Sequence, residues 1–168
     1  GGNSDITTGG SNYFSALTIN ATGTKTAQRS LDINGNFTLT AGTFAPGSND
    51  VDVAGNWDDS GNNGGFTPSA ATVTLSGTGT TVTAGTNNNF FNLTTSGGTK
   101  TAQTELDIDG DLTVSSGELA VGTNNADVAS GKTVNIDGTL SISTGTFTAN
   151  GPTAVSYTHL RAHETCTN

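Results

Sequence analysis

A fourteen-residue pattern occurs three times in the chain, from Leu31 to Phe44, from Leu106 to Leu119 and from Val134 to Phe147. Each copy alternates apolar and polar residues, has a glycine after an Asn or Asp, alternates again and reaches a second glycine near its end. Short stretches of period-two alternation separated by glycine are typical of β-strands joined by tight turns. The molecule is therefore predicted to be built from repeated strand-and-turn units.

A longer unit repeats as well, because the residues Thr24–Gln28 return as Thr99–Gln103, 75 residues further on. Related strand-and-glycine stretches begin near Val51 and Thr72. Steps of about 20 to 28 residues, the larger being the distance from Leu106 to Val134, suit one coil of a parallel β-helix. We therefore expect an all-β fold, a right-handed parallel β-helix or solenoid of about six or seven coils.

The alternative is an antiparallel β-sandwich, in which the same strands would pair as hairpins. Whole repeated phrases favour the parallel stack, in which neighbouring coils present like positions to one another. In either fold Leu31 and Ile33 should point inward and Asp32 outward. The glycines after Asn, Asp or Ser are expected to supply the positive φ of sharp corners, at Gly35, Gly77, Gly110 and Gly138.

The composition is close to that of disordered chains, with 31% apolar residues, 11% charged residues and a net charge of −9. The regular alternation argues against disorder. The low apolar content is still compatible with folding, because a stack of coils needs only a thin apolar column. The basic residues before position 155 are scattered singly, as Lys25, Arg29, Lys100 and Lys132. That distribution predicts no nucleic-acid partner, and the absence of a long apolar run predicts no membrane insertion in this segment.

The composition changes after Ala154, where both histidines and the single cysteine of the chain are found. Residues 155–165 resemble a translated adapter used to prepare DNA sequencing libraries. We therefore predict a single solenoid region over residues 1–154, a fragment of a longer protein, and a non-native tail over 155–168. This interpretation is favoured over a metal cluster formed by His159, His163, Glu164 and Cys166.

Several short stretches, together with the fourteen-residue pattern, resemble the repeats of large, secreted, adhesin-like bacterial surface proteins. They are Gly55–Trp57, Gly65–Pro68, Thr72–Gly77 and Phe90–Thr94. The resemblance implies an extracellular or cell-surface location and a β-helical stalk or adhesive filament. It also implies cell-surface glycans or other extracellular surfaces as partners. The expected function is therefore structural or adhesive, without catalysis.

The densest acidic cluster is formed by Asp107, Asp109 and Asp111, which makes these residues candidates for calcium. Gly110 interrupts the spacing that a helical calcium loop requires, so outward-facing polar residues at a turn are the favoured interpretation. No other cofactor is expected. The sequence provides no catalytic residue that stands out from its surroundings.

A polysaccharide-binding or polysaccharide-cleaving β-helix is the alternative function. Trp57, beside Asp58 and Asp59, is the best candidate for a carbohydrate contact, although a Trp in the core is the more common arrangement. The carboxylates considered for catalytic pairs are Asp50, Asp52, Asp58, Asp59, Asp127 and Asp137. A third alternative is ice binding through Thr-x-Thr triplets, at Thr24–Thr26, Thr72–Thr74, Thr81–Thr83 and Thr99–Thr101, whose irregular spacing favours ordinary strand formation.

Overall fold

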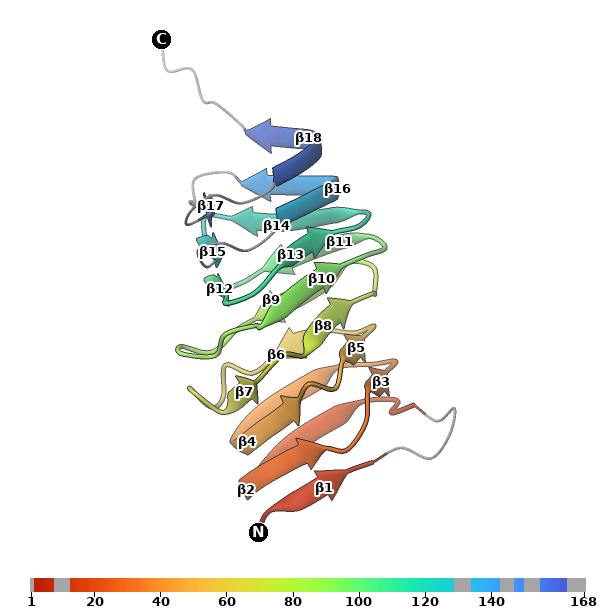
Figure 1. Cartoon of the computed structure of the whole chain (residues 1–168), viewed down its shortest axis with the longest axis vertical. Helices are drawn as coiled ribbons and strands as arrows, with labels where there is room; N and C mark the ends of the chain where they lie inside the picture. Colours follow the sequence, from red (N-terminus) through yellow and green to blue (C-terminus); the bar gives the residue numbers. More distant parts are fainter. Residues whose placement is uncertain (1, 8–12, 129–133, 143–146, 150–154, 163–168) are drawn as a thin grey trace.

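The computed structural model describes residues 2–7, 13–128, 134–142, 147–149 and 155–162. All elements in these residues are β-strands, and neighbouring strands in them run parallel. The turns climb from β1 (Ser4–Ile6) at one end to β18 (Val155–Ala162) at the other (Figure 1). The predicted parallel β-solenoid is confirmed, and the antiparallel sandwich is wrong for this part of the chain.

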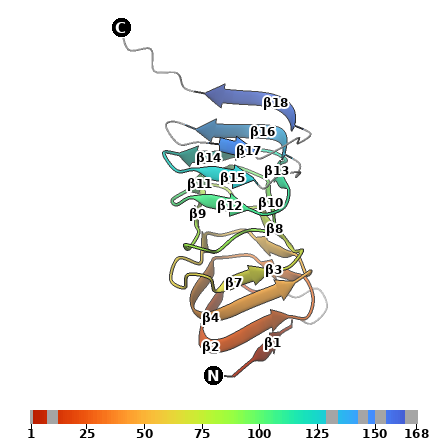
Figure 2. The ribbon, with the colours of Figure 1, turned by 60° about the vertical axis from the view of Figure 1, so that its left-hand side comes forward.

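The strands form three faces, which the chain visits in the same order in each turn (Figure 2). The first face holds β3 (Leu31–Ile33), β5 (Val51–Val53), β8 (Thr72–Leu75), β10 (Asn92–Thr95), β13 (Leu112–Val114) and the start of β16 (Val134–Ile142). The second holds the first halves of β2 (Leu17–Ala27) and β4 (Phe37–Gly47), then β6 (Trp57–Asp58), β9 (Thr80–Thr83), β11 (Thr99–Ala102), β14 (Glu118–Gly122) and the end of β16. The third holds β1, the second halves of β2 and β4, β7 (Phe66–Pro68), β12 (Leu106–Ile108), β15 (Ala126–Val128) and β17 (Phe147–Ala149).

One turn takes about 20 residues, as the pairing along the first face shows. Successive partners on that face are Leu31, Val51, Val73, Leu93, Leu112 and Val134. Strand β18 pairs with β16 and continues the stack. The turn between β6 and β9 is longer, because Asp58 pairs with Thr83.

The fourteen-residue pattern does not stay on one face. The copies that begin at Leu31 and Val134 start on the first face, whereas the copy that begins at Leu106 starts on the third face, in β12. Leu106 pairs with Ala126, not with Val134. The expectation that the 28 residues from Leu106 to Val134 form one coil is therefore wrong, since that step spans one turn and one further face. The pattern fits any face because all three alternate inward and outward side chains in the same way.

Inward side chains form a continuous apolar core along the stack. Leu31 and Ile33 are buried while Asp32 is exposed, and Leu106 and Ile108 are buried while Asp107 is exposed, as the alternation predicts. One part of the core is aromatic, and the ring of Trp57 stacks on that of Phe37 at 4.3 Å between centroids. Phe66 and Phe90 lie against the same indole, at 4.9 and 5.3 Å. Such ring pairs stabilise a core beyond the area they bury.

The glycines that follow Asn, Asp or Ser serve a purpose other than the one expected from the sequence. Gly35, Gly77 and Gly110 do not have positive φ. Instead, a Cβ atom on each would lie 1.9 to 2.2 Å from a carbonyl oxygen of the preceding turn. The prediction of positive φ is therefore wrong at these three positions, which need glycine for close approach. Gly138, the fourth, lies within strand β16.

Candidate functional site

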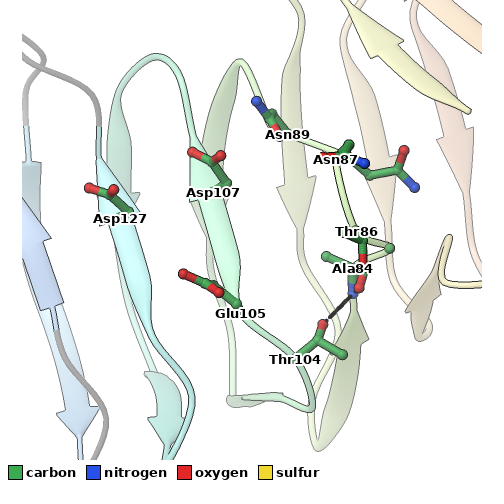
Figure 3. Close-up of a pocket in the computed structure, with 10 residues that line it drawn as sticks. Ala84, Thr86, Asn87, Asn89, Thr104, Glu105, Asp107 and Asp127 are labelled. Atoms are coloured by element: carbon green, nitrogen blue, oxygen red, sulfur yellow. Dashed lines mark hydrogen bonds between the residues drawn. The ribbon is translucent and has the colours of Figure 1, made fainter. Parts of the chain in front are cut away.

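A hollow of about 420 Å³ opens on the third face, between the segment 84–89 and strands β12 and β15. The third face has no strand between β7 and β12 in the described residues, and the segment 84–89 takes the place of one. This irregular segment leaves the hollow beside it. The side chains that line it include Asn87, Asn89, Thr104, Glu105, Asp107 and Asp127 (Figure 3).

One wall of the hollow is acidic. Asp107 and Asp127 are direct partners on the parallel strands β12 and β15 and lie side by side in Figure 3. Although the Asp107 side chain is exposed, partial desolvation of its carboxyl raises the pKa, and the negative charges of Asp109, Asp127 and Glu105 raise it further. The ordinary pKa of an Asp is 3.8. A proton or a cationic group at Asp107 would relieve this repulsion.

The opposite wall is the segment 84–89, which hydrogen bonds hold to the next turn. The Thr104 hydroxyl donates to the carbonyl oxygen of Ala84 at 2.9 Å and accepts from the Ala84 amide at 2.8 Å. The Asn89 side-chain amide donates to Asp109 at 3.2 Å. A second, smaller hollow of about 250 Å³ is also lined by Asn87 and Asn89, together with Phe66, Pro68 and Asp109. The position of this segment therefore shapes two hollows.

Asp107, Asp109 and Asp111 do not converge on a metal site. Within the described residues, no group of three or more His, Cys, Asp or Glu side chains could hold a metal ion. Asp109 accepts a hydrogen bond from Asn89, and the backbone amide of Asp111 donates to Asn92 Oδ1 at 2.8 Å. The geometry therefore gives no support to calcium binding by these three residues.

Trp57 lies in the core and not on the surface. Its side chain is fully buried among Phe37, Phe66 and Phe90, so the indole offers no face to a sugar. Trp57 as a carbohydrate contact is therefore corrected to a core residue. The neighbouring Asp58 is half-buried and accepts hydrogen bonds from the amide and the hydroxyl of Ser60, at 3.1 and 2.6 Å.

Asp59 is a buried carboxylate, 1% exposed, next to the segment 84–89. Its Oδ1 accepts a hydrogen bond from the backbone amide of Gly85 at 2.7 Å. Burial raises the pKa of Asp59 to about 6, against the opposing effects of Gly85, Trp57 and Asn88. The indole of Trp57 thus lies close enough to lower this pKa, yet neither Trp57 Nε1 nor Asp59 Oδ2 completes a hydrogen bond. Asp59 is therefore a core group, and it offers no exposed carboxylate to a ligand.

The remaining carboxylates named from the sequence lie in different places. Asp52 is the direct partner of Asp32 on the first face and accepts a hydrogen bond from the Ser76 hydroxyl. Asp50 accepts from the Thr72 amide at 2.9 Å, and with Asp32 and Asp52 it lines a hollow of about 320 Å³. The surroundings of the Asp137 side chain are outside the described residues.

Lys100 is a buried residue that the sequence interpretation did not single out. Its side chain is fully buried, and its Nζ donates to the carbonyl oxygens of Gly77 and Ser96 and, at 2.9 Å, to that of Gly98. Desolvation by burial lowers the pKa of Lys100. The signal was present in the alternation, because Lys100 and Ala102 occupy the inward positions of β11 and alternate with Thr99 and Thr101.

The C-terminal part of the chain adds one described strand. His159 lies in β18, which pairs with β16, while His163, Glu164 and Cys166 lie outside the described residues. The non-native origin of residues 155–168 therefore stays a prediction. The described residues include no helix long and apolar enough to span a membrane.

Comparison with known proteins adds no assignment: no family model matches the chain, and no curated protein or solved structure is significantly similar to it.

Proposed function

We propose that this chain is a structural or adhesive segment of a secreted or cell-surface bacterial protein, and that it has no catalytic activity. The observation that carries the proposal is the stack of parallel turns around one apolar core in the described residues. Such a stack has its contacts between neighbouring turns and gains length with every repeat. A fold of this kind is suited to a spacer that holds a contact surface away from its attachment point.

The surface supports the same proposal. Outward positions are mainly Thr, Asn and Asp, and the net charge is −9. This composition keeps a rod soluble and disfavours association between rods. The segments 59–65 and 84–89 interrupt the regular strands and provide irregular surface for contact with glycans or other extracellular surfaces.

The test is to measure shape, binding and turnover on one preparation of the whole chain. Small-angle scattering should give an elongated particle. Binding to a panel of immobilised polysaccharides should be reduced at least severalfold by the double substitution Asn87→Ala and Asn89→Ala, and should be unaffected by the remote Asp5→Asn. Elongated particles without any binding would support a purely structural segment. Release of new reducing ends from a polysaccharide would overturn the proposal.

The second candidate is a polysaccharide-binding or polysaccharide-cleaving solenoid. It is favoured by Asp107 and Asp127, which are direct partners across one strand pair and line the same hollow. Carboxyl groups about 5 Å apart, with one pKa raised, are the arrangement used in retaining glycoside hydrolysis. Asp107→Asn should abolish any release of reducing ends if this candidate is correct, whereas Asp32→Asn on the first face should not.

Ice binding receives less support from the arrangement of the triplets. Thr24–Thr26 lies on the third face, Thr72–Thr74 on the first, and Thr81–Thr83 and Thr99–Thr101 on the second. A flat lattice of hydroxyls would need the triplets on one face, so the Thr residues are better explained by their preference for strands.

A further inference from the structure

The segments 59–63 and 84–89 are joined by an interconnected set of polar groups. The side-chain amide of Asn88 donates to the carbonyl oxygens of Asp59 and Asn62, at 3.0 and 3.1 Å. The Asn88 side-chain oxygen accepts from the backbone amide of Phe66 at 3.1 Å, and Asn63 accepts from that of Thr86. These bonds place polar groups where the third face has no strand of its own.

Asp59 is the ionisable member of this set, and its hydrogen bonding is incomplete. Its Oδ1 is held by the Gly85 amide, while its Oδ2 is buried and has no hydrogen-bond partner. Trp57 Nε1, which influences the same carboxyl, is also buried without a partner. Buried polar atoms without partners cost free energy, and a buried negative charge costs more. Ionisation of Asp59 therefore works against the closed arrangement.

We propose that Asp59 is a proton-controlled latch, which fastens the segment 84–89 onto the segment 59–63 in acid and loosens it as the pH rises. In the closed state the carboxyl is buried against Gly85 and the indole of Trp57. In the open state the segment 84–89 separates from it and water reaches the carboxylate. Because this segment forms a wall of both hollows on the third face, the latch also controls their shape.

The direction follows from proton linkage. The carboxyl binds its proton more tightly in the closed state, with a pKa of about 6, than in a hydrated open state, with the ordinary value of 3.8. The state that binds the proton more tightly is favoured at low pH. The ratio of closed to open molecules should therefore fall as the pH rises from 4 to 8, by at most about 150-fold for this difference in pKa.

The charges around the latch do not offset this effect. Asp58, on the same strand, raises the pKa of Asp59 through its negative charge. Across the segment 84–89 lies the acidic wall formed by Glu105, Asp107 and Asp127. The groups that approach Asp59 from segment 84–89 are the neutral Gly85 and Asn88, and among the described residues no cation contributes to its pKa.

The test is amide hydrogen exchange by NMR between pH 4 and pH 8, with the Gly85 amide as the reporter. Its protection factor, corrected for the pH dependence of exchange in an unstructured peptide, should fall by up to about 150-fold as the pH rises. The Leu93 amide, which donates to the carbonyl oxygen of Asp111 on the first face, reports unfolding of the stack and should stay better protected at every pH.

Two variants test whether the charge of Asp59 itself causes the pH dependence. Asp59→Asn keeps an oxygen for the Gly85 amide and cannot ionise, so the protection of Gly85 should become independent of pH. Asp58→Asn removes the neighbouring charge and should leave most of the pH dependence in place. The proposal is overturned if Gly85 and Leu93 have equal protection throughout, or if the Asp59 carboxyl titrates in the wild-type ¹³C spectrum while Gly85 protection stays constant. The wild-type measurement decides the matter even if Asp59→Asn fails to fold.

Discussion

Gly35 packs directly against Ser15 in the preceding turn, and a Cβ atom at Gly35 would lie only 1.9 Å from the carbonyl oxygen of Ser15. The Ser15 carbonyl oxygen belongs to the backbone, so no flexible side chain can move aside to make room. Gly55 continues the same corner in the next turn, where a Cβ atom would lie 2.4 Å from the carbonyl carbon of Gly35. Close stacking of the turns at this corner therefore depends on the absence of side chains.

We expect Gly35→Ala to lower the free energy of unfolding by about 2 to 3 kcal/mol, because the turns must separate to admit the methyl group. Urea unfolding measures the change. Gly47→Ala is the matched control, since Gly47 has a φ of 67° and nothing within 4 Å of a Cβ atom. It should cost only about 1 kcal/mol, from backbone strain. Equal losses in the free energy of unfolding would show that close packing at Gly35 adds nothing to the cost of the methyl group.

Lys100 gives a second prediction. Replacing it with Met keeps much of the buried volume but leaves three carbonyl oxygens without their donor. We expect Lys100→Met to lower the free energy of unfolding by about 3 kcal/mol, the order of cost for leaving buried polar groups unsatisfied. Lys25→Met is the control, because Lys25 is less buried and its bonds to the carbonyl oxygens of Gly2 and Thr22 are exposed to solvent. A larger loss from Lys25→Met would contradict this interpretation.

The stability of the whole chain should depend on pH in the direction opposite to ordinary acid unfolding. The folded state holds the Asp59 proton up to about pH 6, whereas the unfolded chain releases it near 3.8. Its contribution to stability is therefore greatest below pH 4 and falls as the pH rises to above 6, by at most about 3 kcal/mol. The raised pKa of Asp107 acts in the same direction. Urea unfolding of the wild type and of Asp59→Asn at pH 4.5 and 7.5 checks this, and the variant should lose most of the difference.

Repulsion between Asp107 and Asp127 predicts an effect of salt. Like charges on direct strand partners destabilise a sheet, and salt screens them. We expect Asp107→Asn to raise the free energy of unfolding by about 0.5 to 1 kcal/mol in low salt, with a smaller gain in 1 M NaCl. Asp5→Asn should have little effect, because the strand partner of Asp5 is the uncharged Thr26. A stabilisation of Asp107→Asn that does not change with salt would argue against charge repulsion.

Removing one whole turn should leave the fold intact. Leu93 and Leu112 are partners on the first face, so deleting residues 93–111 brings Leu112 to the position of Leu93. We expect a shorter stack that unfolds cooperatively at lower urea concentration, because each turn contacts mainly its neighbours. Deleting the fourteen residues 93–106 removes a fraction of a turn and should prevent folding, as measured by circular dichroism.

The local features of the fold could be predicted from the sequence because strand alternation is a local property. Leu31, Asp32 and Ile33 lie as their alternation predicts, and the same rule would have placed Lys100 inward. The pairing of turns was not accessible in this way. Since all three faces carry the same pattern, nothing in the residues around Leu106 shows that they pair with Ala126 and not with the matching copy at Val134.

The candidate site could be predicted only in part. The acidic character of Asp107 and its neighbours is visible in the sequence, but the hollow exists because the distant segment 84–89 replaces a strand. Trp57, with Asp58 and Asp59 beside it, is a candidate carbohydrate contact in the sequence, although a core Trp is the more common arrangement. Alternation places Trp57 and Asp59 inward, with the half-buried Asp58 between them facing out. The burial of Asp59 depends on Gly85 and Asn88, which lie more than twenty positions further along the chain.

The 75-residue unit and the turn of about 20 residues are out of step, so the copy that begins at Leu106 has moved by one face from the copy that begins at Leu31. In a longer array of this unit, equivalent side chains would follow a helical path around the axis of the rod. Every third copy would return to the same side. A flat surface on one side of the rod would thus contact only one copy in three. Smaller partners could bind equivalent side chains on each of the three sides.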